Sequence, residues 1–317
     1  MRRIDPMVRL LLLAIILATV LPVSGRWVGI AQFVSNAAVF LLFFLNGLRL
    51  PRREVIAGIG KWKLLLPLVL FVYAAMPAAG WLLWQGTGQV LPPLLALGFL
   101  FLGTLPSTVQ SATAYTSLAG GNVASSVVAA ALLNILGVFI TAPLFSLLAG
   151  SHAAAFDGAG LVKVMTILLL PFAMGQALQG RLGGWVGGHR QLVTWMDRSS
   201  IAIAVYVAFS NAVRQGIWER IDAAGWMGLL TGCAALLVVG YGGAWLAGRA
   251  IGLDRGDRIA MMFAGAQKSV AMGAPLATVL FPPAVAGVIL LPTLAYHLAQ
   301  LIVAAPLASR LKARAAT

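Results

Sequence analysis

The sequence predicts an all-α membrane protein of ten transmembrane helices, and two observations carry that prediction. Of the 317 residues, 61% are hydrophobic and only 9% are charged, whereas a soluble domain has about a quarter of its residues charged. The apolar residues form long runs such as 10–23 and 64–84. Such runs suit membrane helices of about 20 residues and not the alternating strands of a membrane β-barrel. Soluble enzymes, nucleic-acid binders and disordered proteins are therefore excluded.

Apolar runs separated by polar breaks place the expected spans in order along the chain. The ten spans are 8–23, 29–48, 63–84, 92–118, 122–149, 161–180, 199–215, 225–248, 258–281 and 284–308. Basic residues check this count, because cytoplasmic loops are enriched in Lys and Arg. With the amino terminus inside, 17 of the 22 basic residues lie in or beside inside segments and four lie outside. We therefore expect an integral membrane protein with both termini in the cytoplasm, and we assign the net charge of +14 to this topology.

The second and seventh spans end on a shared pattern that suggests an internal repeat. Residues 44–49 and 209–214 both read Phe-x-Asn-x-apolar-Arg, although six residues are few and the match could arise by chance. The pattern recurs five spans apart, and an odd separation inserts the two halves in opposite directions. Inverted repeats of this kind are common in secondary transporters. Asn46 and Asn211 are therefore candidate cavity residues.

The repeat predicts how the chain divides. We expect a first five-helix repeat over 1–150 and a second, inverted repeat over 151–317. The glycine-rich stretch 183–188 is expected to be a flexible connector. The spacing of its glycines is not that of a phosphate-binding loop.

The fourth span carries a concentration of polar residues around a proline. Ser, Thr and Gln crowd positions 104–117, and proline removes a helical hydrogen bond. Non-helical backbone at membrane depth is tolerated only where it is buried in protein or lines a water-filled cavity, so this break is a candidate ion or substrate site. A proline-kinked helix whose hydroxyls bond back to their own carbonyls is the alternative. The candidate residues are Pro106, Ser107, Thr108, Gln110, Ser111 and Thr113.

The ninth span is interrupted in the same way. Residues 261–275 contain glycine and proline breaks and a polar triplet, Gln267, Lys268 and Ser269, midway along an apolar run. Interrupted segments at corresponding positions of two halves are the best sequence indication of a transporter's binding site. The pair is therefore more specific than either break alone.

Lys268 is the sharpest single candidate. All acidic residues, Asp197 and Asp257 among them, are expected in loops or termini, so no membrane carboxylate is expected to pair with it. Ionisable groups within the membrane are functional by default. Lys268 is a fixed charge for an anionic substrate, a built-in cation, or a proton carrier that titrates because burial disfavours its charged form. Snorkelling to an interface is the non-functional alternative.

Four further polar residues lie in or at the ends of expected spans. His297 is either a proton relay or a packed core histidine. Asn122 either faces the site or simply caps the fifth helix, and Ser126 and Asn134 follow it on that helix. No spacing typical of a metal site is present, and we expect no cofactor.

Three segments, 44–50, 120–126 and 267–269, resemble those of the bile acid:sodium symporter family. The Lys-Ser form of the third segment looks most like the branch that includes sodium/bile acid cotransporter seven and its bacterial relatives. The resemblance covers about residues 7–310. It implies a panel domain facing a core domain, with the broken fourth and ninth helices crossing and substrate lying between the domains. The implied panel helices are near 8–23, 29–48, 161–180 and 199–215, and the implied core helices are near 63–84, 92–118, 122–149, 225–248, 258–281 and 284–308.

The resemblance carries over the family's sodium ligands only in part. The residues that match by type are Ser111, Ser126 and Gln267. Phe263 stands where the family's acidic residue is expected, Ala130 and Ala131 hold the place of a threonine, and Lys268 replaces a usual asparagine. We therefore expect Lys268 to stand in for one bound cation, and sodium and proton both stay open as coupling ion.

These observations predict a secondary active transporter for a small organic anion, embedded in the lipid bilayer. The alternative is a regulatory membrane protein that keeps a transporter fold without turnover. An enzyme is not expected, because the spans contain no paired carboxylates and no nucleophile–histidine arrangement.

Overall fold

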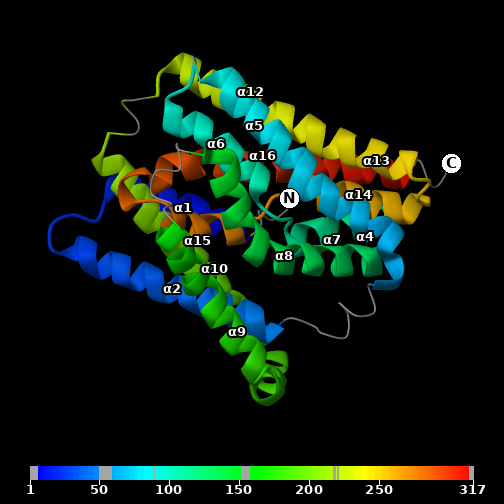
Figure 1. Cartoon of the computed structure of the whole chain (residues 1–317), viewed down its shortest axis with the longest axis horizontal. Coiled ribbons are helices and arrows are strands. Elements are labelled where there is room, and N and C mark those ends of the chain that lie inside the picture. The colour runs from blue at the N-terminus through cyan, green and yellow to red at the C-terminus, as the bar shows by residue number, and fades with distance from the viewer. Residues whose placement is uncertain are drawn as a thin grey trace. The chain divides into compact units, whose positions relative to one another are not determined.

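Helices make up most of the chain that the structure describes. The computed structural model describes residues 6–49, 59–88, 90–150, 158–216, 219 and 221–313, and these residues form no strand. Figure 1 labels the α-helices among the helical elements that the structure describes. These elements are α1 (Pro6–Val20), α2 (Trp27–Arg49), η1 (Ile59–Lys61), α4 (Trp62–Leu70), η2 (Phe71–Ala75), α5 (Met76–Thr87), α6 (Pro93–Thr104), α7 (Val109–Leu118), α8 (Val123–Ala149), α9 (Gly158–Gly188), α10 (Arg190–Arg214), α12 (Ala223–Val238), η4 (Val239–Gly243), α13 (Ala244–Ala250), α14 (Arg255–Ala266), α15 (Val270–Leu280) and α16 (Pro283–Ala313).

Helix is present in each of the ten ranges expected from the sequence. Within the described ranges, six helical segments are long and apolar enough to cross a membrane, and a seventh is added if α6 and α7 form one bent span. The all-helical fold class is thus confirmed, while the count of ten spans stays a prediction. Several basic residues used for the topology lie outside the described residues: Arg2, Arg3, Arg52, Arg53, Arg220 and Arg314.

Two local expectations are wrong. Residues 183–188 do not form a connector, because α9 continues to Gly188. Val186 accounts for this difference, since its buried side chain packs with Leu45 and Val193 and favours helix despite the neighbouring glycines. Asp197 and Asp257 lie inside α10 and α14 and not in loops.

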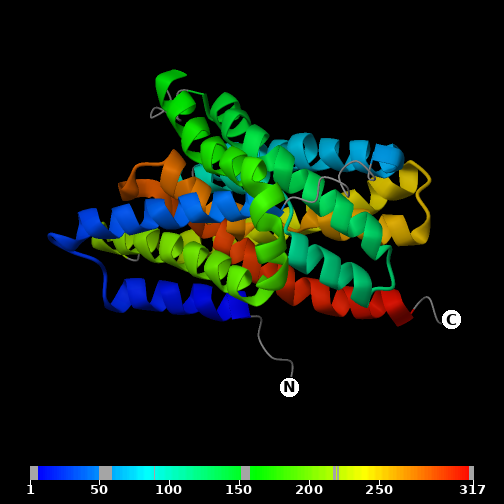
Figure 2. The same ribbon diagram turned by 90° about the horizontal axis from the view of Figure 1, so that it is seen from below.

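The chain divides into two compact units. The first unit comprises Met1–Leu50, Gly150–Asp222 and Ala271–Leu290. In this unit α10 packs against both α1 and α2, as Figure 2 shows, and α2 packs against α9. Gly47 and Gly175 make the α2–α9 contact close: a Cβ atom added to Gly47 would lie 2.2 Å from the carbonyl oxygen of Phe172. Only residues without a side chain allow backbones to approach this closely.

The second unit comprises Pro51–Ala149, Ala223–Val270 and Leu291–Thr317. Within it α5 packs against α6, and α14 packs against α7, α8 and α13. Gly80 and Gly103 allow the close approach of α5 and α6, because a Cβ atom on Gly80 would lie 2.5 Å from the carbonyl oxygen of Phe99. Both helix breaks described below belong to this unit.

Two helical segments of the second unit contain a π turn with a tyrosine at its centre. The turn η2 lies between α4 and α5, and η4 lies between α12 and α13. The Tyr73 hydroxyl donates to the Leu133 carbonyl at 2.5 Å, and the Tyr241 hydroxyl donates to the Gln300 carbonyl at 3.2 Å. Turns of this type are frequent at functional sites.

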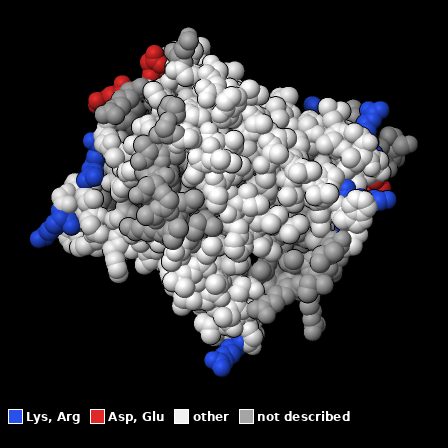
Figure 3. All heavy atoms as spheres, viewed as in Figure 1, with Lys and Arg blue, Asp and Glu red and all other residues white. Residues whose placement is uncertain are grey.

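Large apolar side chains cover much of the described surface. Phe33, Leu147 and Ile302 are each more than 70% exposed, and Figure 3 shows a face on which acidic and basic side chains are few. Exposed apolar side chains in this number are typical of contact with a membrane or a partner. Together with the long apolar helices, it fits a protein whose outer surface faces lipid.

Candidate functional site

The first helix break lies between α6 and α7, which are bent by 64°. Pro106 has no N–H to continue the helical ladder, and a residue before proline is pushed to extended conformations. Leu105 accordingly has φ −70° and ψ 146°, and Thr108 is also extended. The backbone that is extended at Leu105 and Thr108 thus takes the carbonyls of residues 103–107 out of the helical ladder.

The second break separates α14 from α15 and contains Gln267, Lys268 and Ser269. Proline does not cause it: Pro275, expected as part of the break, lies inside α15. Side chains of α16 replace the lost helical bonds. The Tyr296 hydroxyl donates to the Ala266 carbonyl at 2.6 Å. The Gln300 amide accepts from the Lys268 N–H at 2.8 Å and donates to the Lys268 carbonyl at 3.1 Å.

The two breaks lie side by side. The Ser269 N–H donates to the Pro106 carbonyl at 2.9 Å, which joins the extended backbones directly. The Ser111 hydroxyl donates to the Gln267 amide oxygen at 2.6 Å, and the Gln267 amide nitrogen donates to the Tyr241 hydroxyl at 3.1 Å. The structure therefore brings these candidate residues together from two segments about 160 positions apart in the sequence.

Lys268 links the same two breaks through its side chain. The lysine is 1% exposed, and its Nζ atom donates to the carbonyls of Gly103 at 2.8 Å and Leu105 at 2.7 Å. Both acceptors belong to the freed backbone at the carboxyl end of α6. Snorkelling to an interface is therefore excluded for this side chain.

The remaining candidates on the first break differ in their surroundings. The buried Ser107 accepts at its carbonyl from the Asn134 amide at 2.9 Å, and the Thr108 and Ser111 hydroxyls are hydrogen-bonded to each other. Gln110 is exposed on α7. The hydroxyl oxygen of Thr113 is buried with no partner among the described residues. The backbone is unwound here, so a simple kink with back-bonded hydroxyls does not describe this segment.

Asn122 and Ser126 lie away from the breaks at the start of α8. The Asn122 side chain accepts from the Ser125 N–H at 3.2 Å, which is the geometry of a helix cap. The Asn122 N–H donates to the Gly256 carbonyl at 3.0 Å, so the start of α8 is held against the start of α14. Ser126 accepts from the Thr116 hydroxyl at 3.2 Å.

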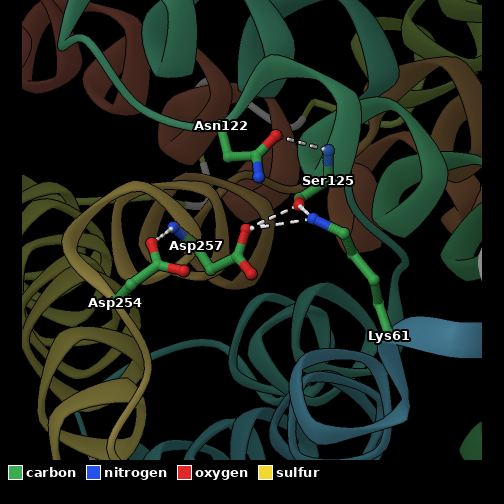
Figure 4. Close-up of polar contacts among 5 residues, drawn as sticks. All are labelled: Lys61, Asn122, Ser125, Asp254 and Asp257. Atoms are coloured by element: carbon green, nitrogen blue, oxygen red, sulfur yellow. Dashed lines mark hydrogen bonds and ion pairs between the residues drawn. The ribbon is translucent and has the colours of Figure 1, made fainter.

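A charged cluster beside Asn122 was not predicted. Figure 4 shows the Lys61 ammonium and the Asp257 carboxylate converging on the Ser125 hydroxyl. The ammonium donates to the hydroxyl at 2.5 Å, and the hydroxyl donates to the carboxylate at 2.6 Å. Asp254 caps α14 by accepting from the Asp257 N–H at 2.9 Å. The sequence offered one indication of this cluster: Lys61 and Asp257 carry opposite charges, and both lie in segments expected on the inside of the membrane.

The other candidate residues are anchored by local contacts. His297 is buried, and its Nδ1 atom lies 2.8 Å from the Gln300 amide nitrogen. Asn134 also donates to the Ala130 carbonyl at 2.8 Å. Asn211 accepts from Arg214 at 3.0 Å, whereas Asn46 is half-buried in α2.

Sequence reasoning missed Gln300, Tyr241 and Tyr296. Each holds the second break by a side-chain hydrogen bond. Gln300 was detectable as a polar residue one turn after His297 in an apolar span. The two tyrosines could not be singled out from the sequence, because a tyrosine in an apolar run is usually interpreted as a packed core residue.

Phe263 occupies the position where the resemblance expects an acidic residue. Its ring is fully buried and lies 5.9 Å from the Tyr115 ring and 6.0 Å from the Tyr241 ring, measured between centroids. Packed aromatic rings fill this place without a carboxylate. The family's sodium ligand is therefore missing from the structure as well as from the sequence.

Two interrupted helices that meet at extended backbone within an apolar helical protein define a membrane transport protein. The sequence makes the assignment narrower. The model of the SBF-like CPA transporter family matches residues 5–313, and the chain belongs to this family. This match confirms the resemblance to the bile acid:sodium symporter family. The matched family is one of transporters and not of enzymes.

Similar proteins come from bacteria and vertebrates. The chain is 38% identical to the uncharacterised protein PA2026 of Pseudomonas aeruginosa, over 95% of this chain and 90% of that protein. It is also 38% identical to YfeH of Escherichia coli, whose name describes a candidate symporter, over 98% of this chain and 94% of that protein. The mouse sodium/bile acid cotransporter 7 is 25% identical, over 88% of this chain and 83% of its own length.

Proposed function

We propose that this protein is a secondary active transporter that moves a small organic anion across the membrane by alternating access. The observation that carries the proposal is the hydrogen bond between the Ser269 N–H and the Pro106 carbonyl, which joins two helix breaks. The family and the relatives named as symporter or cotransporter support transport over a purely regulatory role.

The anionic substrate class rests on the amino end of α7. This half-helix begins at Val109 inside the break, and its N-cap residue Thr108 makes no capping hydrogen bond. Free N–H groups and the positive end of the helix dipole favour an anion there. The exposed Gln110 adds an amide donor on the first turn of α7. The Ser111 hydroxyl already donates to Gln267 and so holds the two breaks together beside this helix end.

The proposal includes ten spans in two inverted five-helix repeats, 1–150 and 151–317. The paired π turns and the paired breaks support this arrangement. Among the described residues, a π turn lies in the third expected span of each repeat and a break lies in the fourth. The grouping of α1, α2, α9 and α10 in one compact unit supports a panel and a core, and residues 271–290, expected in the core, also belong to that unit. The excess of basic residues in expected inside segments supports cytoplasmic termini, and the similarity to two bacterial proteins supports a bacterial inner membrane.

Flux into proteoliposomes tests the proposal. The probes are a radiolabelled bile salt and a panel of aliphatic mono- and dicarboxylates, each measured with separate sodium and proton gradients. We expect uptake of at least one anion above protein-free liposomes, and a loss of about tenfold in Ser111→Ala, since a lost polar contact of about 1.4 kcal/mol changes a rate or affinity tenfold. Ser117→Ala, an exposed serine on the same helix, is the matched control.

Two results would contradict the proposal. One is the absence of protein-dependent uptake of every anion from a correctly folded protein, which would favour the regulatory alternative. The other is equal uptake by Ser111→Ala and Ser117→Ala, which would mean that the two breaks are not part of the transport site.

A further inference from the structure

The five carbonyls freed by the first break can be accounted for individually. Buried backbone carbonyls must find partners, because an unpaired one costs as much as a lost hydrogen bond. Thr141 donates to the carbonyl of Thr104, Ser269 to that of Pro106, and Asn134 to that of Ser107. The remaining two carbonyls, those of Gly103 and Leu105, both receive the Lys268 ammonium.

The position of these two carbonyls is suited to a cation. The last carbonyls of a helix lack intrahelical partners and carry the negative end of its dipole. Unwound carbonyls and half-helix carboxyl ends are the groups that coordinate monovalent cations in transporters. Here both oxygens accept a hydrogen bond from the same nitrogen, the Lys268 Nζ atom, at 2.8 Å and 2.7 Å.

Lys268 is not placed to receive a solute in this structure. Its side chain is almost wholly buried, and both acceptors of its Nζ hydrogen bonds are backbone oxygens of the opposite break. Its own backbone is fixed by both polar groups of the Gln300 amide. A fixed charge awaiting an anion would instead be exposed towards the substrate.

We propose that the Lys268 ammonium is a tethered cation that permanently occupies a two-carbonyl cation site at the carboxyl end of α6. The site is formed by the Gly103 and Leu105 carbonyls, and the ammonium joins the two breaks without a dissolved ion. Removing the ammonium vacates the site, which then binds a small monovalent cation or an alkylammonium ion.

Chemical rescue of Lys268→Ala tests this proposal on purified protein, independently of transport. This substitution removes Cγ, Cδ, Cε and Nζ, and the propylammonium ion supplies the same four atoms. We expect Lys268→Ala to melt below the wild type, and saturating propylammonium or sodium to raise its melting temperature by about 3–8 °C, the range that binding at 100 times the dissociation constant gives a chain of this size. The wild type should not shift.

Three controls make the experiment decisive. Propan-1-ol has the same length as propylammonium without the charge and should not rescue. Lys63→Ala removes an exposed lysine near the start of α4 and should respond to none of the additives. If Lys268→Ala is recovered only when propylammonium is present during purification, the proposal is supported in the same way.

The proposal is overturned by any of three results. Lys268→Ala shows no cation-dependent shift, propan-1-ol rescues as well as propylammonium, or Lys268→Met, which keeps the length and loses the charge, is as stable as the wild type. Failure of anion uptake in liposomes would contradict the proposed function and leave this binding test unaffected.

Discussion

Tyr73 and Tyr241 occupy matching places in two separate helical segments: each is the central residue of a five-residue π turn, and each donates its hydroxyl to a backbone carbonyl of a later helix. Beside each acceptor lies an amide side chain that bonds to a break. Asn134 donates to the Ser107 carbonyl, and Gln300 donates to the Lys268 carbonyl. Each break is thus bound by an amide side chain of a helix whose backbone also accepts a tyrosine hydroxyl.

This relationship predicts that removing either hydroxyl destabilises the protein. Tyr73→Phe and Tyr241→Phe should each cost about 0.5–2 kcal/mol, because a buried carbonyl loses its partner. Tyr241→Phe should cost more, since Gln267 also loses its acceptor. Thermal unfolding in detergent measures both. Tyr206→Phe, which breaks a bond at an exposed position, should have a smaller effect, and equal effects for all three would contradict the prediction.

The α2–α9 contact should tolerate no methyl group. Gly47→Ala and Gly175→Ala place a Cβ atom 2.2 Å from a backbone oxygen of the facing helix, so the helices must separate at a cost of about 1–3 kcal/mol or more. Gly180→Ala, on α9 with nothing within 4 Å of its added atom, should be neutral or stabilising. A Gly47→Ala protein as stable as Gly180→Ala would show that this packing is wrong.

Lys61 and Asp257 should be energetically coupled through Ser125. A double-mutant cycle of Lys61→Met and Asp257→Asn isolates the pair, and we expect a coupling of about 0.2–1 kcal/mol because Lys61 is partly exposed to solvent. The coupling should weaken in 1 M salt, where the screening length falls to about 3 Å. No coupling at low salt would mean that the cluster is not maintained in solution.

Labelling tests the proposed orientation. In a Cys233→Ser background, Arg26→Cys and Lys312→Cys each present one exposed thiol on opposite expected sides. An impermeant maleimide applied to intact cells should label Arg26→Cys only, and lysis should expose Lys312→Cys. Labelling of Lys312→Cys in intact cells would contradict a cytoplasmic carboxyl terminus.

The sequence predicts the helices, because long apolar runs are typical of membrane helices. It also predicts the location of both breaks, because polar residues within such runs destabilise the membrane-embedded protein unless they form a site or a hydrogen bond. Pro106 marks the first break by its missing N–H. The cause of the second break was misplaced, since Pro275 stays helical and Tyr296 and Gln300 hold the backbone open instead. Contacts from a later helix leave no local signal in the residues that they unwind.

The partners of Lys268 were equally inaccessible to sequence reasoning. A lone intramembrane lysine predicts a function but not its acceptors, and those proved to be carbonyls about 165 positions earlier. Asp197 shows the same limit. Its place inside α10, hydrogen-bonded to Arg49, depends on how α2 packs.

Anion uptake by wild-type proteoliposomes, with sodium replaced by choline on both sides of the membrane, tests the tethered cation and the transport function together. A lysine that permanently occupies the cation site predicts that uptake persists at a comparable rate without sodium. Uptake that stops without sodium and saturates at millimolar sodium would contradict a cation site filled by Lys268.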